Sequence, residues 1–417
     1  MRILHVNKFL YRRGGAEGYM IDVGAMQARR GHEVDYFSMS HPDNDRGHDL
    51  EPTFPSYVEL EPPPGGPAAL GAAARMIWSR EAKKGLAEAI SRFRPDVLHC
   101  HNIYHQLSPS ILSAAMDAWV PVVMTLHDYK LACPSYQMLD RGKVCDACVG
   151  GSTLPALMRR CKGGSLPGSA LLALESGLHR AMKAYGGVDA FICPSRFIAD
   201  VHQRQGITPE RLHVVPHFVH TEGIPQNDGT GAGIVFGGRL AHEKGVDTLV
   251  EAAALVPDVP VHVAGDGPER RRLEELARAH PEANNITFHG RLPSAELLQL
   301  IARSRAMVVP SRWNENQPMT ILEAYGAGTP VIATDLGGMP ELVRHDVDGL
   351  IVPADDAPAL AAAMRRLSDN AALAHRMGLA GQAHLREVHD PERHLDALEA
   401  VYAAAGAPIS TITGVAG

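Results

Sequence analysis

Two glutamates in the second half of the chain, Glu315 and Glu323, have side chains suited to holding sugar rings. A carboxylate accepts two hydrogen bonds side by side, so it can hold a pair of adjacent hydroxyls. One of the two would hold a donor sugar and the other a ribose. Because the E-x7-E spacing also occurs often by chance, the interpretation depends on the residues around the pair.

The residues around these glutamates predict a binding place for phosphate. The run MVVPS (307–311) is apolar and ends in Pro and Ser, which is typical of a buried strand. Pro318 fits the first position of a helix that continues to Gly326 or Gly328, and TPVIAT is the next strand. At such a helix start, free backbone N–H groups and the helix dipole attract anions. A sugar, a ribose and the phosphates between them make up a nucleotide-sugar.

Two basic residues earlier in the chain extend this prediction. In IVFGGRLAHEKGVD (234–247), a strand gives way to Gly238, then to Arg239 and Lys244, and then to a helix. Two cations beside a helix start can neutralise a diphosphate, the arginine through its planar fork and the lysine as a point charge. We therefore interpret Arg239 and Lys244 as phosphate ligands rather than as solvated surface residues.

Histidines gather where strands of the first half are expected to end. The predicted strand PDVLHCHN ends in His99 and His101, and VPVVMTLHDYK delivers His127 to the same edge. Open α/β sheets bind their ligands at the carboxyl ends of the strands. A histidine at a strand end more often makes a structural hydrogen bond than takes part in catalysis, so we interpret His99 and His101 as structural.

Gly14 and Gly15 stand between a predicted strand at residues 2–9 and a predicted helix from Met20 to Arg30. Glycines there let the backbone approach a phosphate or a sugar closely, although an ordinary tight turn has the same pattern. The stretch is not G-x-G-x-x-G, and no acidic residue closes the next strand. A nicotinamide-dependent oxidoreductase is therefore disfavoured.

Four cysteines follow the pattern C-x11-C-x2-C-x12-C, at Cys133, Cys145, Cys148 and Cys161. Four thiolates gathered in one insertion suit a closed, structural zinc site. Such a site would pin a loop of the first half and would do no chemistry, because it leaves no open coordination position. The CxxC pair alone is only half a site, and it is also compatible with redox chemistry or with chance.

The composition limits the classes of function. A length of 417 residues is enough for two α/β domains, and a net charge of −7 argues against a nucleic-acid binder. The N-terminal MRILHVNKFL is interpreted as a first strand rather than a signal peptide, and with no run of about 18 apolar residues we expect no transmembrane segment. Six cysteines without a secretion signal indicate a cytoplasmic protein, with a peripheral membrane contact left open.

Strands and helices alternate along the chain, which predicts an α/β protein with two Rossmann-like domains. We place the first at residues 1–215, with a cysteine-rich insertion at 133–161, and the second at 216–392. An amphipathic helix at 393–405 follows. Residues 41–70, rich in Pro, Asp and Gly, are expected to form an irregular surface excursion.

Several of these motifs together resemble the retaining glycosyltransferases of family 4. The E-x7-E pair, the small residues of EAYGAGTPVIATDLGG, the PELV after them and the earlier GRL…EKG all match that family. In many members Pro-Phe-Gly follows the first glutamate, whereas here Asn316-Gln317-Pro318 follows it. This departure resembles a subgroup that acts in polysaccharide and secondary-metabolite assembly.

The resemblance implies the GT-B architecture, in which two Rossmann-like domains face their parallel sheets across a cleft and a last helix crosses back to the first domain. It implies that His127 contacts the donor sugar near the reacting carbon, that the Gly14–Gly15 loop closes over the donor, and that Arg291 and Leu292 seat the nucleotide base. The implied catalytic residues are His127, Arg239, Lys244 and Glu315. The implied donor-binding residues are Gly14, Gly15, Gly238, Arg239, Lys244, Arg291, Leu292, Glu315, Asn316, Pro318, Met319, Thr320 and Glu323.

The implied reaction moves a sugar, with retention, from a nucleotide-diphospho-sugar to a hydroxyl of a small-molecule, glycan or lipid-linked acceptor. Such a step belongs to polysaccharide, glycolipid or secondary-metabolite biosynthesis, and the leaving phosphate itself helps to deprotonate the acceptor. Two alternatives stay open on the same fold. One is a nucleotide-sugar 2-epimerase, and the other is a non-catalytic nucleotide-sugar-binding partner.

We expect no catalytic metal. Asp43-Asn44-Asp45 and Asp346-Val347-Asp348 match the Asp-x-Asp pattern that holds divalent ions in many sugar transferases. Neither follows a predicted strand at the cleft edge, so both are interpreted as turn residues. Arg239, Lys244 and the helix start at Pro318 are expected to balance the diphosphate charge instead.

Overall fold

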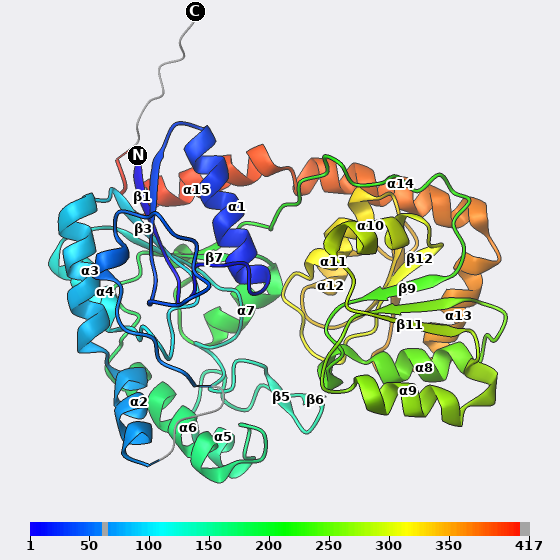
Figure 1. Ribbon diagram of the computed structural model, residues 1–417, viewed down its shortest axis with the longest axis horizontal. Helices are drawn as coiled ribbons and strands as arrows, with labels where there is room; N and C mark the ends of the chain where they lie inside the picture. The colour runs from blue at the N-terminus through cyan, green and yellow to red at the C-terminus, as the bar shows by residue number, and fades with distance from the viewer. Residues whose placement is uncertain (61–65, 409–417) are drawn as a thin grey trace, which may run out of the picture.

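The computed structural model describes residues 1–60 and 66–408. These residues form two α/β halves, each built around a six-stranded parallel sheet (Figure 1). Residues 61–65, part of the predicted surface excursion, lie outside the described residues. Among the described residues, none of the helices combines the length and the apolar character needed to cross a membrane.

The N-terminal sheet has the strand order β2-β1-β3-β4-β7-β8. Its register pairs His5 with His99, so two histidines lie next to each other on neighbouring strands. The strands are β1 Arg2–Val6, β2 Glu33–Phe37, β3 Val97–Cys100, β4 Val122–Thr125, β7 Ala190–Cys193 and β8 Leu212–Val214. The helices of this half are α1 Gly15–Arg29, α2 Pro67–Ile77, α3 Arg80–Phe93, α4 Ser110–Asp117, α5 Leu154–Met158, α6 Leu166–Ala181 and α7 Arg196–Arg204.

The C-terminal sheet has the order β11-β10-β9-β12-β13-β14. Its strands are β9 Ile234–Gly237, β10 Val261–Ala264, β11 Ile286–Gly290, β12 Ala306–Val309, β13 Val331–Thr334 and β14 Gly349–Val352. The helices are α8 Val246–Ala254, α9 Arg270–Ala279, α10 Ser294–Ala302, α11 Met319–Gly326, α12 Met339–Leu342, α13 Ala357–Ser368 and α14 Ala371–Val388. The central strands β12 and β13 are buried at every residue, as expected of apolar parallel strands that helices cover on both faces.

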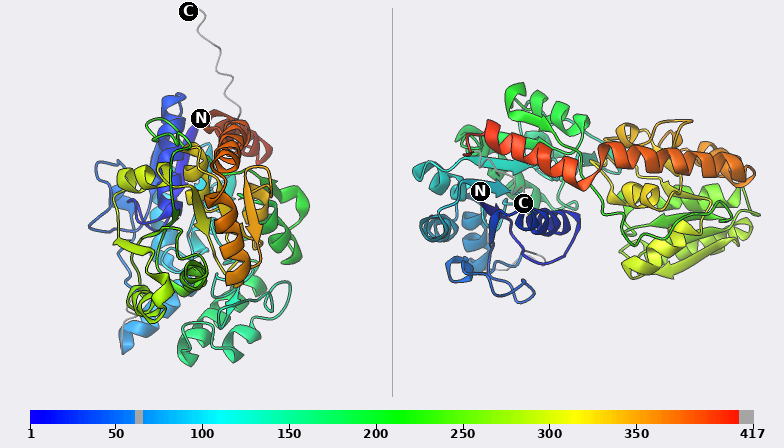
Figure 2. Two further views of the ribbon diagram at one scale, coloured as in Figure 1. Left: turned by 90° about the vertical axis from the view of Figure 1, so that its right-hand side faces the viewer. Right: turned by 90° about the horizontal axis from the view of Figure 1, so that it is seen from above.

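The helix α15 (Pro391–Ala404) continues from α14 and packs on the N-terminal half (Figure 2). Its Tyr402 accepts a hydrogen bond from Gln27 Nε2 of α1 at 2.9 Å. His394 Nε2 lies 2.9 Å from the hydroxyl oxygen of Tyr19, also on α1. Arg30, just after α1, adds ion pairs to α15 carboxylates. The end of the chain is thus part of the N-terminal core.

The cysteine-rich segment contains a small antiparallel hairpin, β5 (Leu139–Asp140) and β6 (Lys143–Val144). In Figure 1 this hairpin extends from the N-terminal half toward the C-terminal half. Its turn residue Gly142 has φ +80°, and a Cβ there would lie 2.4 Å from Nε2 of His242 in the other half. The insertion therefore contacts the loop that carries Lys244.

Several helices begin at other residues than the sequence predicts. α1 begins at Gly15 rather than Met20, because the packing of Tyr19 and Glu17 in the core outweighs the low helix propensity of its glycines. Two separate helices cover residues 67–93: Met76 belongs to α2, and Ser79 caps α3 through a hydrogen bond from Ala82 N. Pro318 is the N-cap of α11 and not its first residue, because its ψ of 117° is extended.

Candidate active site

The carboxyl ends of the two sheets face each other. The loop after β12 meets the loops after β4 and β7: Asn316 Nδ2 donates to the Leu126 carbonyl at 3.0 Å, and the Ser195 hydroxyl donates to Asn316 Oδ1 at 2.9 Å. Tyr129 OH donates to the Asn314 carbonyl at 3.1 Å. A ligand bound where open α/β sheets bind ligands would therefore touch both halves.

Glu315 is the centre of the C-terminal side of this cleft. Its Oε1 accepts a hydrogen bond from Lys244 Nζ at 2.6 Å and another from Ser311 Oγ at 2.7 Å. Burial raises the pKa of Glu315, but the Lys244 charge and these hydrogen bonds outweigh burial, and the pKa lies below its usual value. The structure thus brings together two of the residues that the sequence singled out, from different motifs.

Glu323 is in the second turn of α11 and is half-buried. Among the described residues, no hydrogen bond or ion pair is recorded for its carboxylate. Burial raises the pKa of Glu323. A partly buried carboxylate without a protein partner is costly, so this side chain is available for a ligand's hydroxyls.

The N-terminus of α11 lies between the two glutamates. Pro318 is its N-cap, no side chain caps it, and Met319 and Thr320 form its first turn. Uncapped N–H groups at a helix start favour an anion. The remaining backbone and base positions predicted from the sequence lie at strand ends, with Gly238 after β9 and Arg291 and Leu292 after β11.

The two predicted phosphate cations differ in their surroundings. The Lys244 side chain is 24% exposed and points at Glu315, whereas the Arg239 side chain is 62% exposed and forms an ion pair with Glu243. Gly245, after Lys244, has φ +65°, and a Cβ there would lie 2.0 Å from the Pro310 carbonyl. Only glycine allows the Lys244 loop to pack this closely on the end of β12.

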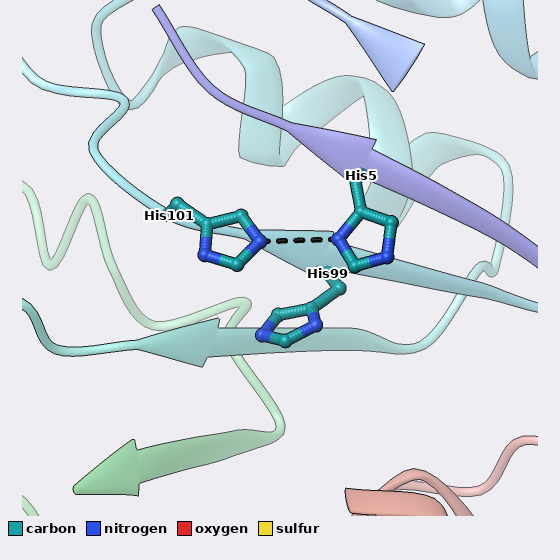
Figure 3. A group of neighbouring side chains, drawn as sticks. All are labelled: His5, His99 and His101. Carbon is teal, nitrogen blue, oxygen red and sulfur yellow. Dashed lines mark hydrogen bonds between the residues drawn. The ribbon is translucent and has the colours of Figure 1, made fainter. Parts of the chain in front are cut away.

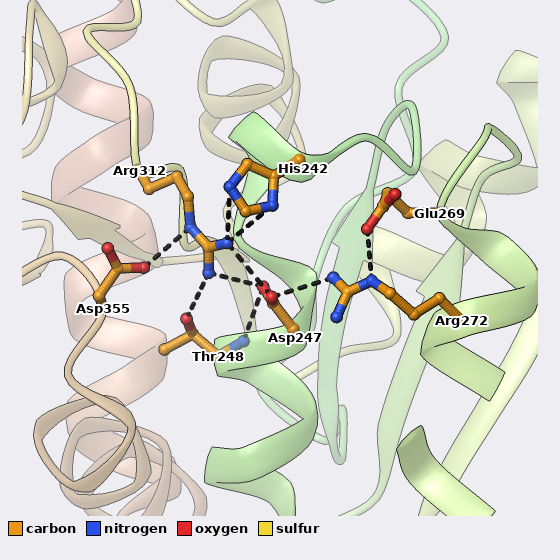
Figure 4. Close-up of polar contacts among 7 residues, drawn as sticks. All are labelled: His242, Asp247, Thr248, Glu269, Arg272, Arg312 and Asp355. Carbon is orange, nitrogen blue, oxygen red and sulfur yellow. Dashed lines mark hydrogen bonds and ion pairs between the residues drawn. The ribbon is translucent and has the colours of Figure 1, made fainter. Parts of the chain in front are cut away.

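Arg312 is a residue of this site that sequence reasoning missed. Its guanidinium pairs with Asp247 at the start of α8, with Asp355 at 2.8 Å and with Thr248 Oγ1 at 3.1 Å (Figure 4). The Arg312–Asp247 contact has two hydrogen bonds, of 2.6 and 3.2 Å. Such a two-pronged pair has a fixed geometry, so it holds the loop of Glu315 against the helix that follows Lys244.

The N-terminal side of the cleft is lined by neutral or internally paired groups. A small cavity is bordered by His127, Asn102, Tyr104, Asp128 and Lys130, among others. Burial lowers the pKa of His127 to about 3, so its ring is neutral. Tyr104 OH donates to Asp128, and the Lys130 amide donates to the other Asp128 oxygen at 2.9 Å. Asp128 therefore orients its neighbours.

The Gly14–Gly15 pair forms the N-terminus of α1, directly at the end of the β1 loop. Gly14 is the N-cap, and no side chain caps the helix. A Cβ on Gly15 would meet no atom within 4 Å. Backbone strain does not require glycine at these two positions. The missing side chains leave room beside a second helix N-terminus that no side chain caps.

The departure from the family motif, Asn316-Gln317, makes contacts to the other half of the molecule. Asn316 bonds to Leu126 and Ser195, as described above, and Gln317 Oε1 accepts a hydrogen bond from the backbone N–H of His217 at 2.6 Å. Asn316 was predicted to bind the donor. In the structure its side-chain amide connects the Glu315 loop to the residue before His127.

The four cysteines of the predicted zinc site line one small cavity, together with Arg159 and Pro155. Burial raises the pKa of Cys148 and raises that of Cys161 to about 11. Arg159 donates to Cys145 Sγ at 3.1 Å. Among the described residues, one group of metal-type side chains has its ligand atoms within 4.8 Å of one another, and it consists of His5, His99 and His101 rather than the cysteines.

The second Asp-x-Asp match is part of a turn. Asp348 is fully buried and accepts hydrogen bonds from the Arg344 backbone and side chain and from Tyr325 OH. In the first match, the Asn44 N–H donates to the His41 carbonyl at 3.2 Å. Both contacts are those of turn residues.

Two family models match the chain in succession. The model described as Glycosyltransferase Family 4 matches residues 13–222, and the model described as Glycosyl transferases group 1 matches residues 223–384. Together they cover both halves.

Similar curated proteins are enzymes that handle sugars. An exopolysaccharide phosphotransferase of Streptomyces coelicolor and a glycogen synthase of Mycobacterium tuberculosis are each 34% identical over 42% of this chain. The matches cover only 19% and 43% of those proteins, so the chain spans less than half of each. A D-inositol 3-phosphate glycosyltransferase of Geodermatophilus obscurus is 29% identical over 94% of this chain and 85% of its own.

Solved structures share the fold over nearly the whole chain. A sucrose-phosphate synthase from Thermosynechococcus elongatus matches with a TM-score of 0.70 and 20% identity, covering 96% of this chain and 98% of its own. Anabaena HepE in complex with UDP matches with a TM-score of 0.68 and 19% identity, covering 97% and 100%. The predicted GT-B architecture, with two parallel-sheet α/β halves, is confirmed.

Proposed function

This chain belongs to glycosyltransferase family 4, and from that membership we propose that it transfers a sugar, with retention, from a nucleotide-diphospho-sugar to a hydroxyl acceptor. The observation that carries the proposal is the 2.6 Å pair of Lys244 and Glu315, with the uncapped start of α11 beside it. A cation, a carboxylate and free backbone N–H groups together match a phosphate next to a sugar.

In the proposed complex, the phosphates of the donor lie at the start of α11 and against Lys244, with Arg239 at the open edge. Phosphate binding would release Glu315 from Lys244, and the freed carboxylate would then hold hydroxyls of the donor sugar. Glu323, which has no protein partner among the described residues, would hold the ribose. Arg291 and Leu292 would border the base, and the Gly14–Gly15 helix start would close over the donor.

The protein contributes positioning and charge stabilisation rather than a nucleophile. The leaving phosphate takes the acceptor proton, and Lys244 and the α11 N–H groups balance the charge that develops on the phosphate. We propose that no catalytic metal takes part. We propose that residues 1–215 form the acceptor-side domain and that residues 216–392 bind the donor. The helix at 393–405 completes the first domain. The N-terminal half would then determine the acceptor class, whether a small molecule, a glycan or a lipid-linked sugar.

The experiment begins with a thermal-shift screen of common nucleotide-sugars, starting with UDP-sugars because HepE was solved with UDP. A ligand that binds only the native state raises the melting temperature. Donor turnover is then followed with and without acceptors, and the anomeric configuration of any product is read by NMR. Conversion of the donor alone would indicate a 2-epimerase. Binding without turnover on any acceptor would indicate a non-catalytic partner.

Two matched variants test the roles of the carboxylates. Glu315→Gln should lower turnover, and Glu323→Gln should mainly lower the affinity for UDP, each by about 10- to 100-fold, because a hydrogen bond to a charged group contributes about 1.5–3 kcal/mol. The melting temperature of Glu323→Gln should not fall, since no protein contact is lost and the burial cost of the carboxylate is removed. Wild-type kinetics in both variants would contradict the assignment.

We also propose that Cys133, Cys145, Cys148 and Cys161 hold a structural zinc ion. Closing of the cavity onto a metal would bring the four sulfurs together, and it would order the hairpin that contacts His242. Purified protein should then contain about one zinc per chain, and Cys148→Ser should lose it, with a lower melting temperature. Metal-free protein whose four thiols react with an alkylating agent while its stability is unchanged would exclude the site.

The protein is further proposed to act in the cytoplasm, with a membrane contact if its acceptor is lipid-linked. Cell fractionation followed by immunoblotting tests this assignment. Recovery only in an extracellular or periplasmic fraction would contradict it.

A further inference from the structure

A chain of hydrogen-bonded histidines leads from the buried centre of the N-terminal sheet to His127. His5 Nδ1 lies 3.1 Å from His101 Nε2, and His101 Nδ1 lies 3.0 Å from His127 Nε2. The inner end of the chain is Gln27, whose Oε1 lies 2.7 Å from His5 Nε2. Figure 3 shows the facing rings of His5 and His101, with His99 beneath them.

These rings are neutral. Burial lowers the pKa of His5 to about 4 and that of His127 to about 3, and it lowers the pKa of His101 well below its usual value. A neutral imidazole has one N–H nitrogen and one bare nitrogen. Each ring with two partners in the chain must therefore donate with one nitrogen and accept with the other.

Gln27 sets the direction of the chain, because an amide has distinct donor and acceptor ends. Its Nε2 donates to Tyr402 OH at 2.9 Å, which leaves Oε1 to accept from His5. His5 is then protonated on Nε2 and bare on Nδ1, so His101 must donate from Nε2. His101 is consequently bare on Nδ1, and His127 must donate from Nε2.

A second branch starts from the same amide. Tyr402 accepts from Gln27, so its own hydroxyl hydrogen is free to point to His99 Nδ1, 2.8 Å away. His99 then carries its proton on Nε2, which lies 2.7 Å from Thr125 Oγ1. A single orientation of the Gln27 amide is therefore consistent with the donor and acceptor roles in both branches.

We propose that Gln27, His5 and His101 are positioning residues that hold His127 in the tautomer with Nε2 protonated and Nδ1 bare, so that Nδ1 accepts a hydrogen bond from a substrate hydroxyl. Among the described residues, no hydrogen bond is recorded for Nδ1 of His127, and the ring borders the cavity at the carboxyl end of β4. The inference rests on the proposed sugar substrate. It adds the direction of the contact: the hydroxyl donates.

The arrangement of His5, His99 and His101 also resembles a metal site, since their nitrogens lie within 4.8 Å of one another. A ligand nitrogen must offer a free lone pair to the metal. Here both nitrogens of each ring already have a hydrogen-bond partner, and all three residues are fully or nearly fully buried. A hydrogen-bonded chain accounts for every nitrogen, whereas a metal would break at least two of these bonds.

The test measures the tautomer directly. In protein labelled with 15N-histidine, nitrogen shifts and two-bond couplings distinguish N–H from bare nitrogens, and the His127 signals are identified by their loss in His127→Asn. We expect Nε2–H and a bare Nδ1 for His127 in the wild-type protein without substrate. A proton on Nδ1 would overturn the proposal, whether or not the protein transfers sugars.

A matched variant tests the role of Gln27. Gln27→Met keeps a similar volume and removes both the donor and the acceptor, so His127 should become a mixture of the two tautomers. The kcat/KM with donor and acceptor should fall by about two- to tenfold, in line with one neutral hydrogen bond of about 0.5–1.5 kcal/mol. UDP affinity should be unchanged. An unaltered tautomer in folded Gln27→Met would overturn the role of Gln27, and if the variant does not fold, the wild-type spectrum still decides.

A deoxyfluoro donor series separates this inference from the proposed function. Fluorine accepts hydrogen bonds weakly and donates none, so replacing the hydroxyl that faces His127 should lower kcat/KM by a larger factor in the wild type than in His127→Asn, because the inductive effect of fluorine is common to both. If sugar is transferred and each fluoro analogue lowers kcat/KM by the same factor in the wild type and in His127→Asn, the proposed function holds and the inference fails.

Discussion

The two sides of the cleft differ in the chemistry that lines them. On the C-terminal side, Lys244, Glu315, Arg312 and Asp247 are charged and form ion pairs with one another. On the N-terminal side, the groups nearest the cleft are neutral histidines in a hydrogen-bonded chain, and the buried Lys130 is neutralised by Glu175 at 2.8 Å. Ion pairs thus dominate the C-terminal side of the cleft, and neutral histidines lie nearest the cleft on the N-terminal side.

This difference fits a ligand whose own charge is at one end. Charged groups act over several ångströms and can neutralise the charge of phosphates. Neutral hydrogen-bonding groups act only at contact, and they distinguish hydroxyls by whether these donate or accept. A nucleotide-diphospho-sugar has its phosphates at one end and its hydroxyls at the other. The division also predicts that the two halves respond differently to pH and to mutation.

The largest expected difference between the halves is their response to mild acid. His5 and His202 are fully buried in the N-terminal half, and burial lowers the pKa of each to about 4. The unfolded chain protonates these two histidines near pH 6.5, whereas the folded chain keeps them neutral down to about pH 4. Their contribution to the free energy of unfolding is therefore complete above pH 6.5 and is lost as pH falls toward 4. Between pH 7.5 and 5, each contributes a loss of about 2 kcal/mol.

The carboxylates of the charged side should lose no stability over that range. The pKa of Glu315 is already below its usual value, so its contribution is lost only when pH falls below about 4.5. Urea unfolding at pH 7.5 and pH 5, followed by hydrogen exchange of peptides from each half, measures the two separately. Equal losses in both halves would show that the neutral histidines do not distinguish them.

Replacement of Arg312 tests whether ion pairs stabilise the charged side of the cleft. In Arg312→Met, Asp247 keeps its half-exposed ion-pair partner Arg272 at 3.0 Å and the Thr248 N–H at 3.2 Å, and its carboxylate stays partly buried. Leaving a buried charge without a partner costs about 3–5 kcal/mol; because Arg272 remains, the loss should be smaller than this but larger than for an exposed pair, which urea unfolding should detect. The control Arg366→Met removes an exposed pair with Asp346 and should change stability by about 1 kcal/mol or less. Equal effects of the two variants would contradict the structural role of Arg312.

Sequence reasoning found more of the charged side than of the neutral side, for a physical reason. Lys244 and Glu315 belong to short motifs in which glycine, proline and a helix start reveal the loop. Arg312 was missed although it lies three residues before Glu315, because an arginine after a strand is usually solvated. Its partner Asp247, in the first turn of the predicted helix, was the available signal.

Only the outer part of the histidine chain was predicted from the sequence, because His5 and Gln27 were not singled out and the order of the hydrogen bonds was not predicted. The strand pattern placed His99, His101 and His127 at the ends of neighbouring strands, which the structure agrees with. The hydrogen-bond order depends on side-chain direction and on Tyr402, whose bond to Gln27 spans 375 residues. No local pattern contains that contact. The predicted start of α1 was wrong for a similar reason, because core packing of its first residues outweighed the low helix propensity of its glycines.

Replacement of Lys244 tests whether the C-terminal side of the cleft neutralises the phosphate charge. Lys244→Ala removes the cation that holds Glu315 and should lower kcat by about 100- to 1000-fold, as for other preorganised charge donors. Arg239→Ala should have a smaller effect, because its side chain is 62% exposed and paired with Glu243. Kinetics at saturating donor measure both. A rise of about tenfold in wild-type kcat on adding Mg²⁺, in zinc-replete protein, would show that a metal carries part of this charge.

The smallest effect is expected at Asn316, where the two sides meet. The sequence assigned this residue to the donor, but its amide bonds to the Leu126 carbonyl and to Ser195, both on the N-terminal side. Asn316→Ala should therefore misplace His127 relative to Glu315, and two neutral hydrogen bonds of about 1 kcal/mol each limit the loss of kcat to about 10- to 30-fold. UDP affinity belongs to the charged side and should stay unchanged. Ser195→Ala breaks one of the same bonds from the other half and should change kcat in the same direction, by less. A fall in UDP affinity with unchanged kcat would mean that Asn316 binds the donor after all, and that the division between a charged and a neutral side does not extend to this loop.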